Sequence, residues 1–112
     1  MEVKLNIGGT LFTTTKATVM GSGADSGSLL AIMFDDDQAV GKKMIDGGFF
    51  FDRDGTHFAF VLSYLRDGNQ QVASIPEEKL AAVKIEAEFF QLAGMNLLKH
   101  DRLEAHFVVH II

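Results

Sequence analysis

Residues 49–68 read FFFDRDGTHFAFVLSYLRDG, and this stretch says more about the fold than any other part of the chain. Residues 49–51 form a short apolar run without alternation, bounded by glycines and Asp52, which predicts a strand buried on both faces. Asp54 then stands where a helix N-cap is expected, because its carboxylate can accept hydrogen bonds from the free N–H groups of the first helical turn. The stretch therefore predicts a strand, a charged corner and a helix.

The predicted helix after Asp54 is apolar on two sides and ends at Gly68. The first side follows the i, i+3, i+4, i+7 spacing of an amphipathic helix and consists of Phe58, Val61, Leu62 and Leu65. The second side consists of Phe60 and Tyr64. A helix that is apolar on two sides needs two packing partners, so we expect one side to face the core and the other a neighbouring subunit.

Upstream of this stretch, alternating residues predict a β-hairpin at the N-terminus. Apolar residues alternate with polar ones over residues 3–7, Gly8 and Gly9 follow, and a second, threonine-rich alternating run covers residues 11–15. Residues 20–27 are rich in glycine and serine without any period, which predicts a mobile loop.

Two further helices are predicted, one on each side of residues 49–68. Ser28 is expected to cap a short apolar helix over residues 29–34. Downstream, Ser74 and Glu77 have the spacing of a capping box, with Pro76 in the first turn, and the helix is expected to run to about Gly94. This helix is also apolar on two sides: Leu80, Val83, Ala87 and Phe90 on one, and Ala82, Ile85, Phe89 and Leu92 on the other.

Composition sets limits on the class of protein. The 112 residues are 47% apolar, which suits one domain with a core of its own. The absence of cysteine excludes disulfides, thiolate zinc sites and cysteine nucleophiles, and it agrees with a cytoplasmic location. No signal sequence or membrane span is visible, so no membrane insertion is expected. A net charge of −5 with scattered basic residues argues against a nucleic-acid partner.

Motifs for catalysis or for cofactors are weak. No G-x-S-x-G motif is present and no serine or threonine has an obvious neighbouring base, so we expect no enzyme activity. His106 and His110 have metal-ligand spacing, but their β-branched neighbours disfavour a helix, and a solvated tail is the better interpretation. The acidic run at residues 35–37 lacks the spacing of a calcium loop, and the glycines at 21–27 lack dinucleotide spacing. We therefore expect no metal site and no cofactor.

The charged corner formed by Asp52, Arg53 and Asp54 has two interpretations. It is either a solvated turn between a strand and a helix or a polar contact between subunits, in which arginine forms fork hydrogen bonds to carboxylates of another copy. Arg66 and Asp67 place mixed charge at the other end of the same helix as well. Exposed ion pairs contribute little individually, so only a network repeated around a ring would matter.

Four blocks in this order resemble the potassium-channel tetramerisation family of BTB/POZ domains, particularly its soluble KCTD-type members. They are VKLNIGGTLFTTT at residues 3–15, SLLAIMF at 28–34, the stretch at 49–68, and IEAEFFQLAGM at 85–95. The resemblance implies an α/β fold in which a small sheet with an N-terminal hairpin is packed by about four to five helices. It covers a domain at residues 1–98 and leaves 99–112 as a tail of uncertain structure.

The resemblance also implies a function. Family members assemble side by side into rings, four copies in the channel relatives and often five in the soluble ones. By position, Asp52, Arg53, Asp54 and Arg66 are implied interface residues, with Tyr64 near them. The zinc site that several channel relatives share between subunits is not expected, because it uses cysteine and this chain has none.

The leading hypothesis is a non-catalytic homo-oligomerisation domain that forms a tetramer or a pentamer. The alternative is an adaptor module that recruits a cullin ubiquitin-ligase scaffold, as soluble family members often do. No cullin-contact residues are identified in this sequence.

Overall fold

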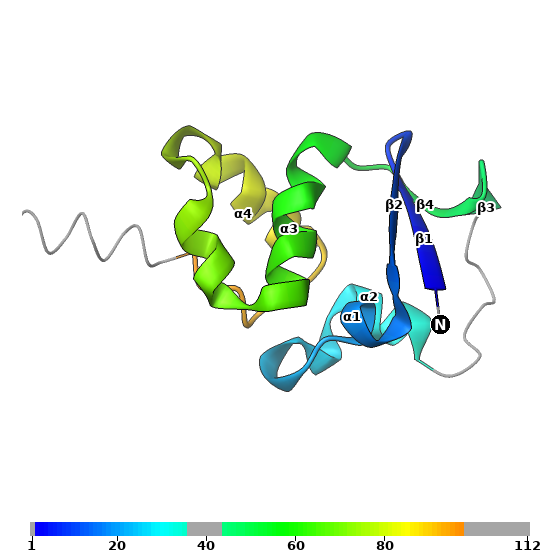
Figure 1. The fold of residues 1–112 in the computed structure, drawn as a ribbon, viewed down its shortest axis with the longest axis horizontal. Coiled ribbons are helices and arrows are strands. Elements are labelled where there is room, and N and C mark those ends of the chain that lie inside the picture. Colours follow the sequence, from blue (N-terminus) through cyan, green and yellow to red (C-terminus); the bar gives the residue numbers. More distant parts are fainter. Residues whose placement is uncertain (1, 36–43, 98–112) are drawn as a thin grey trace, which may run out of the picture.

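The computed structural model of the protein describes residues 2–35 and 44–97. The strands are β1 (Glu2–Ile7), β2 (Thr10–Thr15), β3 (Met44–Ile45) and β4 (Gly48–Phe51). The α-helices are α1 (Lys16–Met20), α2 (Leu29–Phe34), α3 (Gly55–Asp67) and α4 (Leu80–Phe89). Three short 3₁₀ helices are η1 (Gly23–Gly27), η2 (Asn69–Ser74) and η3 (Glu77–Lys79). The strands stand at one end of the described domain and the labelled helices lie beside them (Figure 1).

The four strands form one mixed sheet in the order β2-β1-β4-β3. The β1–β2 pair is the predicted hairpin, with Ile7 opposite Thr10 and both intervening glycines at positive φ. Strand β1 pairs in parallel with β4, so the chain must cross over between them, and α1 and α2 lie within that connection. The predicted small sheet with an N-terminal hairpin and packed helices is confirmed.

The core lies between the sheet and the helices. Its centre is Phe58 of α3, whose ring meets those of Phe12 and Phe90 edge to face, with centroids 5.0 and 5.2 Å apart. Phe51 of β4 packs on the same Phe90 ring at 5.4 Å. The inward residues of β1 are fully or almost fully buried against this cluster: Val3, Leu5 and Ile7.

Three predicted helix boundaries are confirmed. The Ser28 hydroxyl accepts a hydrogen bond from the Ala31 N–H at 3.1 Å and caps α2. Asp54 caps α3, and Gly68 ends it at φ 86°, a conformation that favours glycine.

The prediction of a mobile loop at residues 20–27 is wrong. Residues Gly23–Gly27 form η1, closed by hydrogen bonds from the Asp25 N–H to the Ser22 carbonyl and from the Ser28 N–H to the Asp25 carbonyl, both 3.0 Å. Asp25 is buried, and its carboxylate bonds to groups far away in the sequence. These long-range contacts order a segment whose composition indicated only flexibility.

The predicted boundaries of the last helix are also wrong. The Ser74 hydroxyl donates to the Gln71 carbonyl at 2.7 Å instead of forming a capping box, and α4 begins only at Leu80, after η3. Helix α4 ends at Phe89 and not near Gly94. The chain turns at Gln91, which has φ 60°, and the N–H groups of Gln91 and Leu92 bond back to Glu88 and Ala87, as in a Schellman motif.

Two burial predictions need correction. In β4 only Phe51 is buried among the three phenylalanines, while Phe49 and Phe50 are half-buried, so the strand is not enclosed on both faces. In α3 the second apolar side does not face outward as a unit. Tyr64 is buried in the core of its own chain, and Phe60 is half-buried. The predicted tail at 99–112 lies outside the described residues.

Candidate functional site

The charged corner between β4 and α3 is held by α4. The Arg53 guanidinium forms two parallel hydrogen bonds with Glu86, from Nε to Oε1 at 3.1 Å and from Nη2 to Oε2 at 2.8 Å. Hydrogen bonding to Glu86 raises the pKa of Arg53. Arg53 therefore forms a fork contact within its own chain, and the fork contact with another copy stays a prediction.

An aromatic ring completes this arrangement. The Arg53 guanidinium lies 4.4 Å from the centroid of the Phe89 ring, at cation–π distance. Glu86 is buried, whereas the Arg53 side chain keeps about a quarter of its surface exposed. Arginine has five N–H groups and Glu86 accepts from two of them. The other N–H groups of Arg53 are therefore held in position to donate hydrogen bonds at the corner.

Asp54 has a local role beside Arg53. Its carboxylate accepts a hydrogen bond from the Thr56 N–H at 2.9 Å, and this bond is the largest cause of the lowered pKa of Asp54. The His57 Nε2 atom lies 3.9 Å from the other carboxylate oxygen. Asp52 is exposed and makes no ion pair within the described residues, so it is the most available charge of the corner.

The cap predicts a specific dependence on pH. Because the pKa of Asp54 is lower in the folded protein than in the unfolded chain, its charge adds stability above about pH 4, and this contribution disappears as pH falls through the folded pKa. Asp54→Asn keeps a capping oxygen without the charge. Urea unfolding of both proteins between pH 7 and 2.5 should show a constant stability difference near neutrality that shrinks towards zero in acid.

Asp67→Asn is the matched control at the opposite end of α3. A carboxylate there opposes the helix dipole, so its neutralisation should leave stability unchanged or slightly raised at neutral pH. A difference between Asp54→Asn and the parent that persisted in acid would mean that the cap charge is not its source.

The other two predicted interface residues lie at the far end of α3. The Tyr64 hydroxyl donates to the Asp25 carboxylate in the interior, and Arg66 Nη2 donates to the Thr13 carbonyl on edge strand β2 at 2.9 Å. The structure thus brings Asp52, Arg53 and Asp54 together but places Tyr64 and Arg66 about three helical turns away.

Two acidic residues that organise these sites were not predicted. Glu86 lies in the block EAEFF, and its spacing from Phe89 and Phe90 was the only available signal. Asp25 lies among glycines and serines and had no signal, because its partners are 39 and 69 residues away in sequence.

Apolar side chains are exposed next to the charged corner. On α4, Ile85 is 55% exposed and Phe89 38% exposed, and Phe89 contacts Arg53 directly. We call Asp52, Arg53, Ile85 and Phe89 the corner surface. This surface combines an arginine held by a buried carboxylate, an exposed carboxylate and exposed apolar side chains. Such a combination is typical of surfaces that bind other proteins.

Comparison with known proteins agrees with this character. A sequence profile of the BTB/POZ domain, the type found in potassium-channel tetramerisation, matches residues 3–99. The chain belongs to the BTB/POZ domain family. Such domains are protein-interaction domains, and the α/β architecture described above fits the family.

Relatives of this BTB/POZ domain occur in plants and animals. The chain is 39% identical over 94 residues to the FH protein interacting protein FIP2 of Arabidopsis thaliana, covering 84% of this chain and 30% of that protein. It is 38% identical over 101 residues to human BTB/POZ domain-containing protein KCTD14, covering 88% and 35%. A zebrafish (Danio rerio) relative, named BTB/POZ domain-containing adapter for CUL3-mediated RhoA degradation protein 1, is 38% identical over 93 residues, covering 83% and 26%. The chain therefore spans about a third of the length of these relatives.

The described part of this BTB/POZ domain lacks two kinds of feature. None of its helices combines the length and hydrophobicity that crossing a membrane requires. No group of three or more histidine, aspartate or glutamate side chains is arranged there to hold a metal ion. The candidate ligands His106 and His110 lie outside the described residues.

Proposed function

We propose that this BTB/POZ domain assembles with copies of itself into a closed ring of four or five subunits, as a non-catalytic organiser of a larger cytoplasmic protein. The supporting observation is the corner surface, where Arg53 is fixed by Glu86 and Phe89 while exposed groups surround it. A guanidinium held in place loses little entropy when it binds a partner's carboxylate.

Apolar exposure supports the same surface. Ile85 and Phe89 together present a hydrophobic patch that could be covered by a neighbouring copy, and Arg53 and Asp52 supply charge at its rim. In a ring each copy uses two different surfaces, so the corner surface of one subunit would meet another part of the next. Asp54 and Arg66 remain candidate contacts, and Tyr64 would support them from the interior.

The solution mass tests self-assembly directly. Light scattering at micromolar concentration should give a mass four or five times that of the chain, and native mass spectrometry counts the copies. A strict monomer over this concentration range would refute self-assembly.

Reversal of one charge tests the location of the contact. Asp52→Lys should raise the concentration at which the ring dissociates by about tenfold, because it replaces the exposed carboxylate of the corner surface with a cation and so repels the basic group that we expect to face Asp52 on the next subunit. Arg53→Glu is a poorer choice, since it would also set two carboxylates against each other within the chain. Sedimentation velocity over a dilution series measures the change.

Glu77→Lys is the matched control. Glu77 is exposed in η3, at the opposite end of α4 from Glu86, and the substitution changes the net charge by the same amount. Equal weakening by both substitutions would indicate a general charge effect and would remove the corner surface from the contact.

A second function is a cullin adaptor, and it rests on the printed name of the zebrafish relative. The partner would then be a cullin scaffold bound through a surface other than the ring contact. Pull-down with the purified N-terminal domain of a cullin distinguishes the two functions. Binding that survives Asp52→Lys would support a separate cullin surface, and no binding to the parent protein would leave self-assembly alone.

A further inference from the structure

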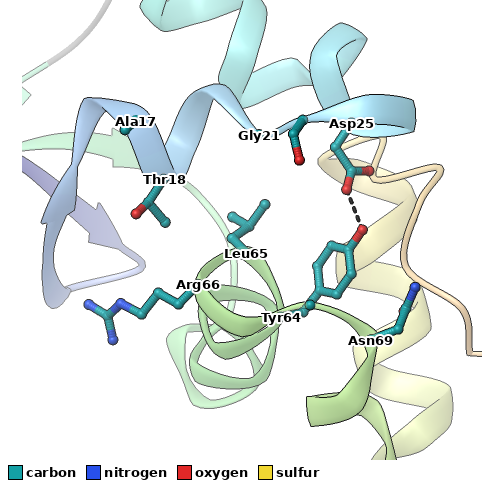
Figure 2. A pocket seen from close by; sticks show the side chains of 10 residues that line it. Ala17, Thr18, Gly21, Asp25, Tyr64, Leu65, Arg66 and Asn69 are labelled. Atoms are coloured by element: carbon teal, nitrogen blue, oxygen red, sulfur yellow. Dashed lines mark hydrogen bonds between the residues drawn. The ribbon is translucent and has the colours of Figure 1, made fainter.

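An open pocket of about 320 Å³ lies between the end of α1, the start of η1 and the end of α3. Figure 2 shows Asp25 and Tyr64 at one end of it and Thr18 and Arg66 towards the other. The pocket lies at the C-terminal end of α3, whereas the corner surface lies at the N-terminal end. The two sites are therefore about 20 Å apart along a helix of 13 residues.

Asp25 is the unusual residue of this pocket. It is 95% buried, and its carboxylate accepts hydrogen bonds from the Gly94 N–H at 2.8 Å on Oδ1 and from the Tyr64 hydroxyl on Oδ2. Within residues 2–35 and 44–97, no basic side chain lies at ion-pair distance from it. A buried carboxylate is normally paired with a cation. The two donors that bond to Asp25 are neutral, so its negative charge stays uncompensated.

The surroundings of Asp25 add to this negative character. The last carbonyl groups of α3 border the pocket through Leu65 and Gly68, and the end of a helix carries partial negative charge. Burial, together with the neighbouring Asp25, raises the pKa of the Tyr64 hydroxyl well above its usual range. Tyr64 therefore stays a neutral donor at any physiological pH.

Arg66 is the one cation on the pocket wall among the described lining residues, and it does not neutralise Asp25. Its Nη2 atom donates to the Thr13 carbonyl, and Figure 2 shows its head pointing away from Asp25. Both polar atoms of Asn69 already form a hydrogen bond, since its Nδ2 donates to the Gly94 carbonyl at 2.8 Å and its Oδ1 accepts from the Asn96 N–H at 2.7 Å. The unmatched group in the pocket is therefore an acceptor with negative charge.

We propose that this pocket binds the guanidinium group of an arginine side chain presented by a partner protein. Each carboxylate oxygen of Asp25 uses one of its two lone pairs, so one remains on each for the two parallel N–H groups of a guanidinium. The hydroxyl of Ser22, which forms no hydrogen bond with the described residues, and the carbonyls at the end of α3 can accept its other N–H groups.

The test uses N-acetyl-arginine amide as the probe and N-acetyl-citrulline amide as its neutral isostere. Tyr64 is the only tyrosine and the chain has no tryptophan, so intrinsic fluorescence reports on this pocket alone. We expect a saturable change with the arginine probe at about millimolar concentration, and binding of the citrulline probe at least about tenfold weaker. Amide shifts of Gly21 and Gly68 locate the binding.

Two substitutions are expected to change the affinity for the arginine probe in opposite directions. Asp25→Asn keeps the shape and a hydrogen-bond acceptor for Gly94, and it should weaken binding of the arginine probe by at least about tenfold. Arg66→Gln removes the like charge from the wall and should strengthen binding roughly two- to fivefold. Glu77→Lys, in η3 and outside the pocket lining, should leave binding unchanged.

Several outcomes would overturn the arginine site. They are equal binding of the arginine and citrulline probes, no saturable response to either, and a response to inorganic phosphate in place of the arginine probe. The last result would mean that Arg66 dominates the pocket. The comparison of the two probes uses the unaltered protein, so it decides the matter even if Asp25→Asn fails to fold.

Discussion

Phe58→Ala is expected to lower the free energy of unfolding by about 3–5 kcal/mol, the range for removing a fully buried phenylalanine. Phe58 has no exposed surface and its ring contacts Phe12 and Phe90, which come from the sheet and from the end of α4. The substitution would leave a cavity where these layers meet. For a domain of this size such a loss is a large part of the total stability, so assembly should be lost as well.

Phe60→Ala is the matched control, two residues along the same helix. Phe60 is half-buried, with the Lys79 ammonium 5.9 Å from the centroid of its ring, so its removal should cost less than half as much. Urea denaturation measures both losses, with the two variants at the same protein concentration because the apparent stability of an oligomer depends on concentration. Similar losses for both would mean that the Phe60 side of α3 is covered in solution, for instance by another subunit.

Gly94→Ala is expected to cost about 2–3 kcal/mol, although it adds only a methyl group. A Cβ atom at this position would lie 2.7 Å from the Tyr64 hydroxyl and 2.8 Å from Asp25 Oδ2. The side chains would have to separate, and the buried bond between Tyr64 and Asp25 would break. Tyrosine fluorescence should report the change in the native state, and urea denaturation the loss of stability.

Gly27→Ala is the control for this substitution. Apart from the chain next to Gly27, no atom of the described residues lies within 4 Å of a Cβ at this position, and its φ is not positive, so stability should change by no more than about 0.5 kcal/mol. Tyr64→Phe in the Gly94→Ala background removes one of the two clashing atoms, so the double variant should lose less than the sum of the single ones. Strict additivity would place the cost of Gly94→Ala elsewhere.

Local signals were sufficient for several elements. The alternation around Gly8 and Gly9 predicted the hairpin, and Ser28, Asp54 and Gly68 predicted helix ends that the structure has. In each case the hydrogen bonds involved join residues close in sequence, so neighbouring residue types decide the outcome. The family resemblance rested on the same local blocks.

Two predictions of helix ends, at Ser74 and Gly94, were wrong because contacts with distant residues decide the structure there. Gly94 was taken as a helix stop, whereas α4 turns at Gln91, and Gly94 serves the close approach of Tyr64 and Asp25. Ser74 and Glu77 have the residue types and the spacing of a capping box, but the Ser74 hydroxyl donates to the Gln71 carbonyl instead. A short motif is compatible with several local conformations, and the packing of the whole domain determines which one forms.

The candidate site divides in the same way. The sequence indicated a charged corner at Asp52, Arg53 and Asp54, and the structure places these residues together at the start of α3. It could not indicate that Arg53 is tied to Glu86, because the pair spans 33 residues and forms only when α4 packs beside α3. Nor could the sequence indicate that Tyr64 lies far from the corner in space, since both belong to the stretch at residues 49–68.

The residues of this chain by themselves determined the hairpin, the capped start and glycine end of α3, and membership of the BTB/POZ family, because those features depend on contacts within a few residues. Only the tertiary structure decided that Arg53 is anchored to α4 and that Asp25 is buried against Tyr64 and Gly94. A charge acquires its partner and its environment when distant segments pack together, and that arrangement cannot be read from the neighbours of Asp25 in sequence.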